Sequence, residues 1–257
     1  MQSQLIIYSV IIVLASAIGG IIPFYFKFSH RTIQMILSFV AGIVLGISVL
    51  HLFPHSLEKS SDVHETCMWL LSGVLFMFLV ERFFSFHHHE VEDETPTCSH
   101  SHKLTWTGVT VGLSVHSLIA GLGLAAAVSG ASSESHTGSL LGLSTFIAIL
   151  VHKPFDSLTI SALLALGSQS KLKAVIVNSL FSLMVPFGII LYFLGMEPSA
   201  YLSETLAFCA GVFLCISLSD VLPELHFHHH DRLALSFCLL CGIGLAFCLL
   251  LLEHSGV

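Results

Sequence analysis

Two histidines, His116 and His152, stand at the centres of two long apolar stretches that follow one another in the chain. Asp156 comes four residues after His152, so the two side chains share a face if this stretch is helical. Ser117 directly follows His116. Neutral imidazole combined with a carboxylate suits zinc and similar divalent cations. We therefore predict a metal site formed by His116, Ser117, His152 and Asp156.

The composition indicates which elements must position these residues. Of the 257 residues, 54% are hydrophobic and only 10% are charged, whereas a soluble domain carries about 25% charged residues. A helix that crosses a bilayer needs about 20 apolar residues, and eight segments of the chain meet that requirement. They span approximately residues 5–24, 33–53, 66–86, 105–129, 139–167, 174–194, 201–222 and 233–252. The sequence predicts an all-α, multi-pass integral membrane protein, in which residues 1–257 form one domain of eight transmembrane helices.

The fourth and fifth segments carry a short internal repeat. The stretches 115–122 and 151–158 each have a histidine at their second position, and the two copies are offset by 36 residues. Because consecutive spans cross in opposite directions, this pattern indicates pseudo-inverted repeats. Polar side chains at the centre of a bilayer are costly and usually mark a path for an ion or substrate. The simpler alternative is that each histidine only forms a hydrogen bond with a neighbouring helix.

Lys153 lies between His152 and Asp156 in the sequence and cannot bind a metal while it is protonated. It can pair with Asp156, three residues further on, because isolated charges are poorly tolerated at this depth. On one interpretation the pair only neutralises charge. On the other, the ammonium takes the place of a second cation and leaves a site for a single metal ion.

Two further polar pairs lie toward the ends of the spans. His51 and His55 are four residues apart around Pro54, at the end of the second segment. Asp220 and Glu224 are four residues apart at the end of the seventh segment, on the opposite side of the membrane. We expect the first pair to mark an entrance to the metal site and the second an exit.

The basic residues predict how the chain is oriented, because Lys and Arg gather in cytoplasmic loops. Of the nine Lys and Arg residues, only Lys59 lies in an even-numbered connection and only Lys153 lies at the centre of a span. The other seven lie in the odd-numbered connections or flank them, and they are Lys27, Arg31, Arg82, Lys103, Lys171, Lys173 and Arg232. The odd connections are therefore expected in the cytoplasm, with both termini on the extracellular, periplasmic or lumenal side.

Two histidine-rich tracts fall in these odd connections and are thus expected in the cytoplasm. The first is the loop at residues 87–103, and the second follows the seventh span. Histidine-rich tracts commonly bind metal, so we predict a regulatory metal-binding role, with a solvated linker as the alternative. The histidines concerned are His87, His88, His89, His100, His102, His228, His229 and His230.

The charge balance limits the partners. A formal charge of −7 with only nine basic residues argues against nucleic acid, which requires dense Lys and Arg. The expected partners are divalent metal ions and the lipid bilayer, and a homodimer is compatible with the sequence. No permanently bound cofactor is expected.

Taken together, these motifs resemble the ZIP family of metal-ion transporters. The resemblance covers the whole chain, including the eight spans, the outward termini and the histidine-rich third loop. The matching stretches are His51-Leu52-Phe53-Pro54, Glu81, His116-Ser117 with Gly121, His152-Lys153, Pro186-Phe187-Gly188 and Leu222-Pro223-Glu224. The resemblance implies a membrane-buried centre between the fourth and fifth spans that moves zinc, and sometimes iron, manganese or cadmium, into the cytoplasm. His116, Ser117, His152 and Asp156 would then hold the metal or support its ligands.

The chain departs from the family pattern at two positions. Most members carry Asp or Glu where this chain has Ala120, and Gly where it has Ser157. The loss of that carboxylate, together with the charge of Lys153, indicates a mononuclear centre.

Two other classes of function fit part of the pattern. A membrane-embedded zinc hydrolase would also place His, Asp and Ser in the bilayer, with the metal activating water. A metal sensor without transport would explain the histidine tracts and the missing carboxylate. Ligands at mid-depth with polar pairs on both sides favour a carrier of Zn²⁺, with Fe²⁺, Mn²⁺ and Cd²⁺ as further substrates.

Overall fold

All regular structure in the described residues is helical, which confirms the predicted all-α class. The structure is a computed structural model, and it describes residues 2–25, 29–84, 101–131, 139–195, 201–227 and 232–255. The α-helices are α1 (Gln2–Ile21), α2 (His30–Ile47), α3 (Phe53–Lys59), α4 (Val63–Phe84), α5 (Ser101–Ala131), α6 (Ser139–Leu166), α7 (Lys171–Ser182), α8 (Met184–Gly195), α9 (Leu202–Phe227) and α10 (Arg232–Ser255). A 3-10 turn at Ile22–Phe24 extends α1, and a π-helical turn at Ser48–Leu52 joins α2 to α3.

In this described part, eight helical segments are long and apolar enough to cross a membrane, as predicted. The second span combines α2, the π-turn and α3, and the sixth combines α7 and α8. The span predicted at residues 174–194 is present, and it consists of two helices with a break at Leu183. Pro186 has no N–H to bond the carbonyl of Ser182, which explains a weak point at this position.

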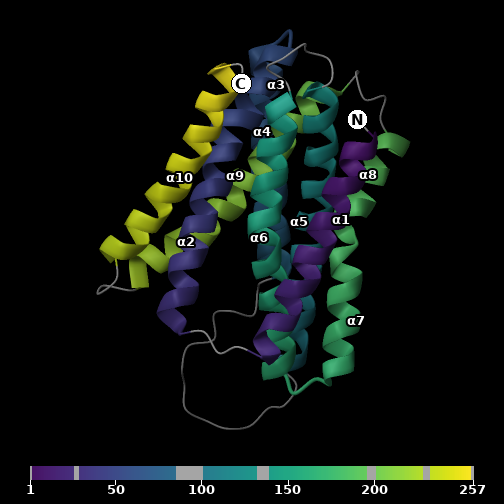
Figure 1. Cartoon of the computed structure of the whole chain (residues 1–257), viewed down its shortest axis with the longest axis vertical. Coiled ribbons are helices and arrows are strands. Elements are labelled where there is room, and N and C mark those ends of the chain that lie inside the picture. The colour runs from purple at the N-terminus through teal and green to yellow at the C-terminus, as the bar shows by residue number, and fades with distance from the viewer. Residues whose placement is uncertain are drawn as a thin grey trace.

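The helices form two groups that lie side by side (Figure 1). In one group α1 packs against α6 and α7, while α5 packs against α6 and α8. In the other, α2 packs against α10 and α9, and α4 packs against α9. The two groups meet where α5 contacts α9 and α2 contacts α6. The start of α1 and the end of α10 lie at the same end of the bundle, as an even number of spans requires (Figure 1).

Glycines allow the closest helix crossings within each group. A Cβ atom on Gly121 of α5 would overlap the carbonyl oxygen of Val185, and the Cα of Gly188 in α8 lies directly opposite. Gly42 of α2 faces the backbone of α10 at Gly242 in the same way. In a membrane, such small residues let backbones approach and gain van der Waals contact where no hydrophobic force exists between helices. The α5–α8 crossing therefore fixes the helix that carries His116.

Hydroxyl and amide groups fix α6, the helix that carries His152. Ser157 of α6 and Ser16 of α1 share a hydrogen bond of 2.6 Å between their Oγ atoms. One turn further along, the Ser161 hydroxyl donates to the carbonyl of Gly20 at 2.7 Å and accepts a bond from the Asn178 amide of α7. These groups are all buried. Because a polar group in hydrocarbon needs a partner, the bonds define one register between α6 and its neighbours.

Candidate metal centre

The two predicted histidines face each other across the contact between α5 and α6. Their Nε2 atoms are 3.3 Å apart, and both side chains are buried. Asp156 lies one turn along α6 from His152, and one potential ligand atom from each of the three residues lies within 4.8 Å of the others. The structure thus brings together two imidazoles and a carboxylate from two neighbouring spans.

A hydrogen bond to the backbone determines which nitrogen of His152 can bind a cation. The Nδ1 atom is 2.7 Å from the carbonyl oxygen of Ala148. A carbonyl only accepts, so Nδ1 must carry the proton, and the Nε2 of the neutral ring presents its lone pair to His116. Nδ1 of His116 is buried and has no hydrogen-bond partner in the described part of the chain. Its proton can therefore reside on either nitrogen.

The separation of the two Nε2 atoms is compatible with a shared cation. Two nitrogens bound at about 2.0–2.1 Å to one tetrahedral zinc ion lie about 3.3 Å apart, and the observed separation is 3.3 Å. The same distance suits an N–H···N bond from His116 to His152 when no cation is bound. The pair can hence exchange an internal hydrogen bond for a metal ion with little movement of either helix.

The carboxylate of the centre is already paired with Lys153. The ammonium Nζ lies 3.2 Å from Oδ2 of Asp156 and also donates to the Oγ of Ser117 on α5. Ser117 donates its own proton to the carbonyl of Leu113 at 2.6 Å. The predicted pairing of Lys153 with Asp156 is therefore present. Ser117 contributes by holding the ammonium, and its role as a metal ligand stays a prediction.

A small cavity opens beside the histidines and the carboxylate. Its volume is about 40 Å³, which is enough for a cation with a water molecule because about 10–15 Å³ suffices for one water. Apart from these three residues and Ser217 the lining is apolar, and four of its residues come from α2. The lining residues are Leu37, Val40, Ala41, Val44, His116, His152, Phe155, Asp156, Ile216 and Ser217. The candidate ligands thus come from one helix group, and much of the apolar lining comes from the other.

Several side chains at the centre were not predicted from the sequence. The Phe213 ring of α9 meets both imidazoles edge-on, with centroid distances of 5.8 Å to His116 and 6.3 Å to His152. The Phe181 ring of α7 lies 4.1 Å from the Lys153 ammonium. The chain contains 20 phenylalanines, so nothing in the sequence distinguishes these two. Ser217 lines the cavity from near the end of the seventh span, where its hydroxyl is one of many in the spans and gives no distinguishing signal.

The residues predicted to mark the entrance do not line the cavity. His51 is fully buried in the π-turn, and its Nε2 donates to the carbonyl oxygen of Ala246 in α10 at 3.0 Å. His55 lies in α3 and pairs with Glu58, with 3.0 Å between Nδ1 and Oε2. The hydrogen bond to Ala246 therefore connects the second span to α10 within the same helix group.

The predicted exit residues and histidine tracts fall mostly outside the described residues. Asp220 and Glu224 lie in the helical backbone near the end of α9, and their side chains are not described. The same holds for the side chain of His102 at the start of α5. Outside the described ranges altogether are His87, His88, His89, His100, His228, His229 and His230. Their roles stay predictions.

Comparison with known proteins gives a family match over most of the chain. A family model described as ZIP zinc transporter matches residues 3–109 and 100–250. Zinc transporter 3 of Arabidopsis thaliana is 24% identical over 251 residues, covering 81% of this chain and 70% of that protein. The zinc transporter ZupT of Streptococcus mutans is 24% identical over 239 residues, covering 84% of this chain and 86% of that one. The protein zntB of Dictyostelium discoideum is 30% identical over 89 residues, which are 34% of this chain and 24% of zntB.

Proposed function

Because this chain belongs to the ZIP zinc transporter family, we propose that it carries Zn²⁺ into the cytoplasm through a centre formed by His116, His152 and Asp156. The family match and the names of the similar proteins support divalent metal transport as the general activity. They also disfavour the hydrolase, because members of this family are transporters. The identity of the ion, the direction and the site are the specific parts of the proposal.

The observation that carries the site is the pair of Nε2 atoms 3.3 Å apart, with a carboxylate beside them. Nitrogen and oxygen ligands of this kind suit zinc, and also Fe²⁺, Mn²⁺ and Cd²⁺ with different strength. Three protein ligands leave a fourth position for water. The cluster in the described residues contains no cysteine. That composition favours transport, because a carried ion must leave as well as bind.

A single ion is expected at the centre. The Lys153 ammonium pairs with the Asp156 carboxylate. It therefore neutralises the negative charge that would otherwise attract a second cation. Ala120, one turn along α5 from His116, is fully buried and offers no ligand atom where most family members carry Asp or Glu. The pairing of Lys153 with Asp156 and Ser117 therefore supports a mononuclear site.

The direction of transport follows from the expected orientation. The excess of Lys and Arg in the odd-numbered connections supports an orientation with the histidine-rich tracts in the cytoplasm. Histidine tracts there would receive or sense the arriving ion. Transport toward that side thus gives both tracts a role.

Metal uptake into proteoliposomes tests the proposal directly. The wild-type chain should take up radioactive zinc, and the variant His152→Ala should lose the activity because it removes one of two imidazoles. His64→Ala is the matched control, since His64 is exposed at the start of α4 and lies outside the cavity. Unlabelled Fe²⁺, Mn²⁺ and Cd²⁺ added in excess then rank the competing substrates.

Two outcomes would overturn the proposal. If His152→Ala transports zinc as well as wild type does, the ion takes another route. If the purified wild type binds zinc at this centre but accumulates none in the vesicles, the chain acts as a sensor.

A further inference from the structure

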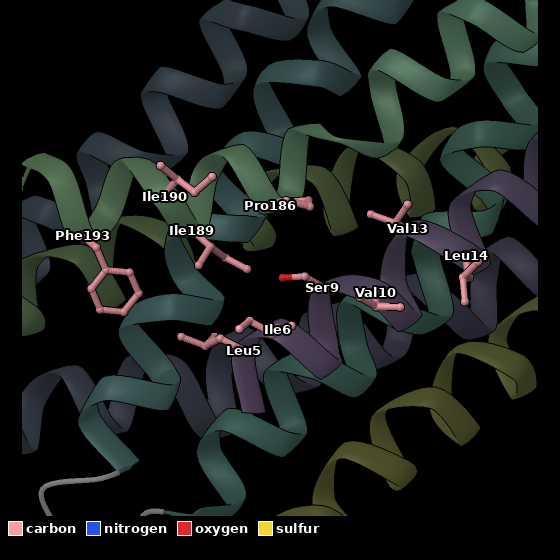
Figure 2. A pocket seen from close by; sticks show the side chains of 10 residues that line it. All are labelled: Leu5, Ile6, Ser9, Val10, Val13, Leu14, Pro186, Ile189, Ile190 and Phe193. Atoms are coloured by element: carbon pink, nitrogen blue, oxygen red, sulfur yellow. The ribbon is translucent and has the colours of Figure 1, made fainter. Parts of the chain in front are cut away.

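An apolar groove lies between α1 and α8, away from the metal centre. Its volume is about 560 Å³, and residues of α1 form one wall while residues of α8 form the other (Figure 2). It extends from Leu5 to Leu14 on α1 and from Phe193 to Pro186 on α8. Both helices belong to membrane-spanning segments, so hydrocarbon is the surrounding medium. The groove therefore faces lipid.

The shape of the groove follows from the break in the sixth span. The chain turns at Leu183 between α7 and α8, and Pro186 lies within the first turn of α8. Gly188 of α8 and Gly121 of α5 allow the backbones of these two helices to approach closely. The α1 wall contains Ser9 and branched aliphatic side chains but no glycine, so α1 and α8 do not have a glycine pair like the one between α5 and α8.

The lining indicates which kind of occupant fits. Ser9 provides the one polar side chain in the lining, and its hydroxyl points into the groove without a hydrogen bond to any described residue (Figure 2). A single hydroxyl offers no set of donors for a charged headgroup. The rim residues Ile6, Val10 and Ile190 are all more than half exposed. The occupant must hence be hydrocarbon along the whole length of the groove.

A helix from a second copy of the chain fits this surface poorly. Close helix contacts in membranes depend on small residues or polar groups. Within this chain, the close crossings at Gly42 and Gly121 follow that rule. The walls of the groove carry aliphatic and aromatic side chains instead, apart from Ser9 and Pro186. A flexible acyl chain needs neither small residues nor polar groups to pack against such walls.

We propose that this groove binds one acyl chain of a membrane phospholipid, with the headgroup outside. The bound acyl chain would contact two helices, α1 and α8, that pack against the helices of the metal centre. α1 braces α6 through Ser16 and Ser157, and α8 braces α5 through Gly188 and Gly121. An acyl chain bound between α1 and α8 thus stabilises the positions of the two helices that carry His152 and His116. That consequence rests on the proposed function, whereas the binding of the acyl chain does not.

Photolabelling of the wild-type protein tests the binding without any substitution. The full chain is reconstituted in vesicles of phosphatidylcholine that contain a small fraction with a diazirine in the middle of one acyl chain. After illumination, peptide mapping should find several-fold more label on the groove residues of α1 and α8 than on Phe237 and Leu240. Those two side chains of α10 are strongly exposed and serve as ordinary lipid-facing controls. Equal labelling of both surfaces would overturn the proposal.

Variants that fill the groove provide an independent readout. Val10→Trp and Ile190→Trp each add bulk from one wall, and Ile18→Trp adds the same group on the exposed face of α1 outside the groove. Groove labelling should fall several-fold in the first two variants and stay at the wild-type level in the third. Unchanged labelling in a folded Val10→Trp or Ile190→Trp would exclude an acyl chain. If instead an added bifunctional cross-linker joins wild-type chains to each other through α1, a second copy occupies the groove and the proposal is wrong.

Discussion

The ammonium of Lys153 lies 3.2 Å from Oδ2 of Asp156, one turn further along α6, and the pair is more than four-fifths buried. The carboxylate of the candidate centre is therefore shared between a permanent cation of the protein and the cation to be carried. Burial makes this sharing strong, because charges interact with less screening away from water. The protein holds a neutral pair in the resting site and becomes cationic when a divalent ion arrives.

Removing the Lys153 charge should tighten metal binding. Lys153→Met keeps a long side chain but frees the Asp156 carboxylate and removes a repulsion worth about 1.4 kcal/mol or more, which corresponds to at least about tenfold in affinity. Isothermal titration of the purified protein with Zn²⁺ measures the change. Equal affinity in the variant and in wild type would show that Lys153 does not compete with the ion.

Replacing the same residue with a carboxylate should create a second metal position. Lys153→Asp places two acidic groups beside Ser117, an arrangement that suits a second divalent ion. The number of zinc ions bound per chain, measured by equilibrium dialysis, should rise from one to two. A ratio that stays at one would count against the interpretation of Lys153 as a substitute cation.

Zinc should stabilise the folded protein only when both imidazoles are present. A ligand that binds the folded state raises the unfolding temperature by mass action. Wild type and the control His64→Ala should show this rise in detergent, and His116→Ala should not. A full rise in His116→Ala would move the binding site away from the α5–α6 contact.

The α5–α8 crossing should tolerate no side chain. Gly188→Ala puts a methyl group onto the carbonyl oxygen of Leu118, so we expect a loss of about 1–3 kcal/mol in the free energy of unfolding. Gly244→Ala is the matched control, because a methyl group there meets nothing within 4 Å. Thermal unfolding of both variants in the same detergent compares them. Equal midpoints would show that the two helices can separate without penalty.

The histidine-rich loop should regulate transport without performing it. Deleting residues 87–102 removes expected metal-binding groups but none of the residues that line the cavity. We expect uptake to persist while its dependence on cytoplasmic zinc changes, as measured in vesicles loaded with different zinc concentrations. A correctly inserted variant with no uptake would assign the loop to the transport step itself.

The sequence predicted the features that depend on composition and local spacing. Eight apolar segments required eight spanning helices, and the i, i+4 spacing placed His152 and Asp156 on one face. The approach of His116 to His152 was expected from their equal depth, and the structure places their Nε2 atoms 3.3 Å apart.

Other features depend on tertiary contacts that no local pattern reveals. Phe213 reaches both imidazoles from α9, and His51 turns to a carbonyl of α10. The break at Leu183 is different, because Pro186 is a local signal that is visible in the sequence. A hydrophobicity pattern fixes which segments cross the bilayer, but it contains no information on which faces of distant helices meet.

The π-turn at Ser48–Leu52 gives the second span one residue more than a regular helix of the same height would need. Each residue of an α-helix turns the chain by about 100°, so this extra residue sets the rotation of everything beyond it. Shortening the turn by one residue would swing α3 around its axis and carry His51 away from the Ala246 carbonyl. Insertions and deletions in this short stretch should therefore be far more damaging than point substitutions, and alignments of related chains should show constant length here.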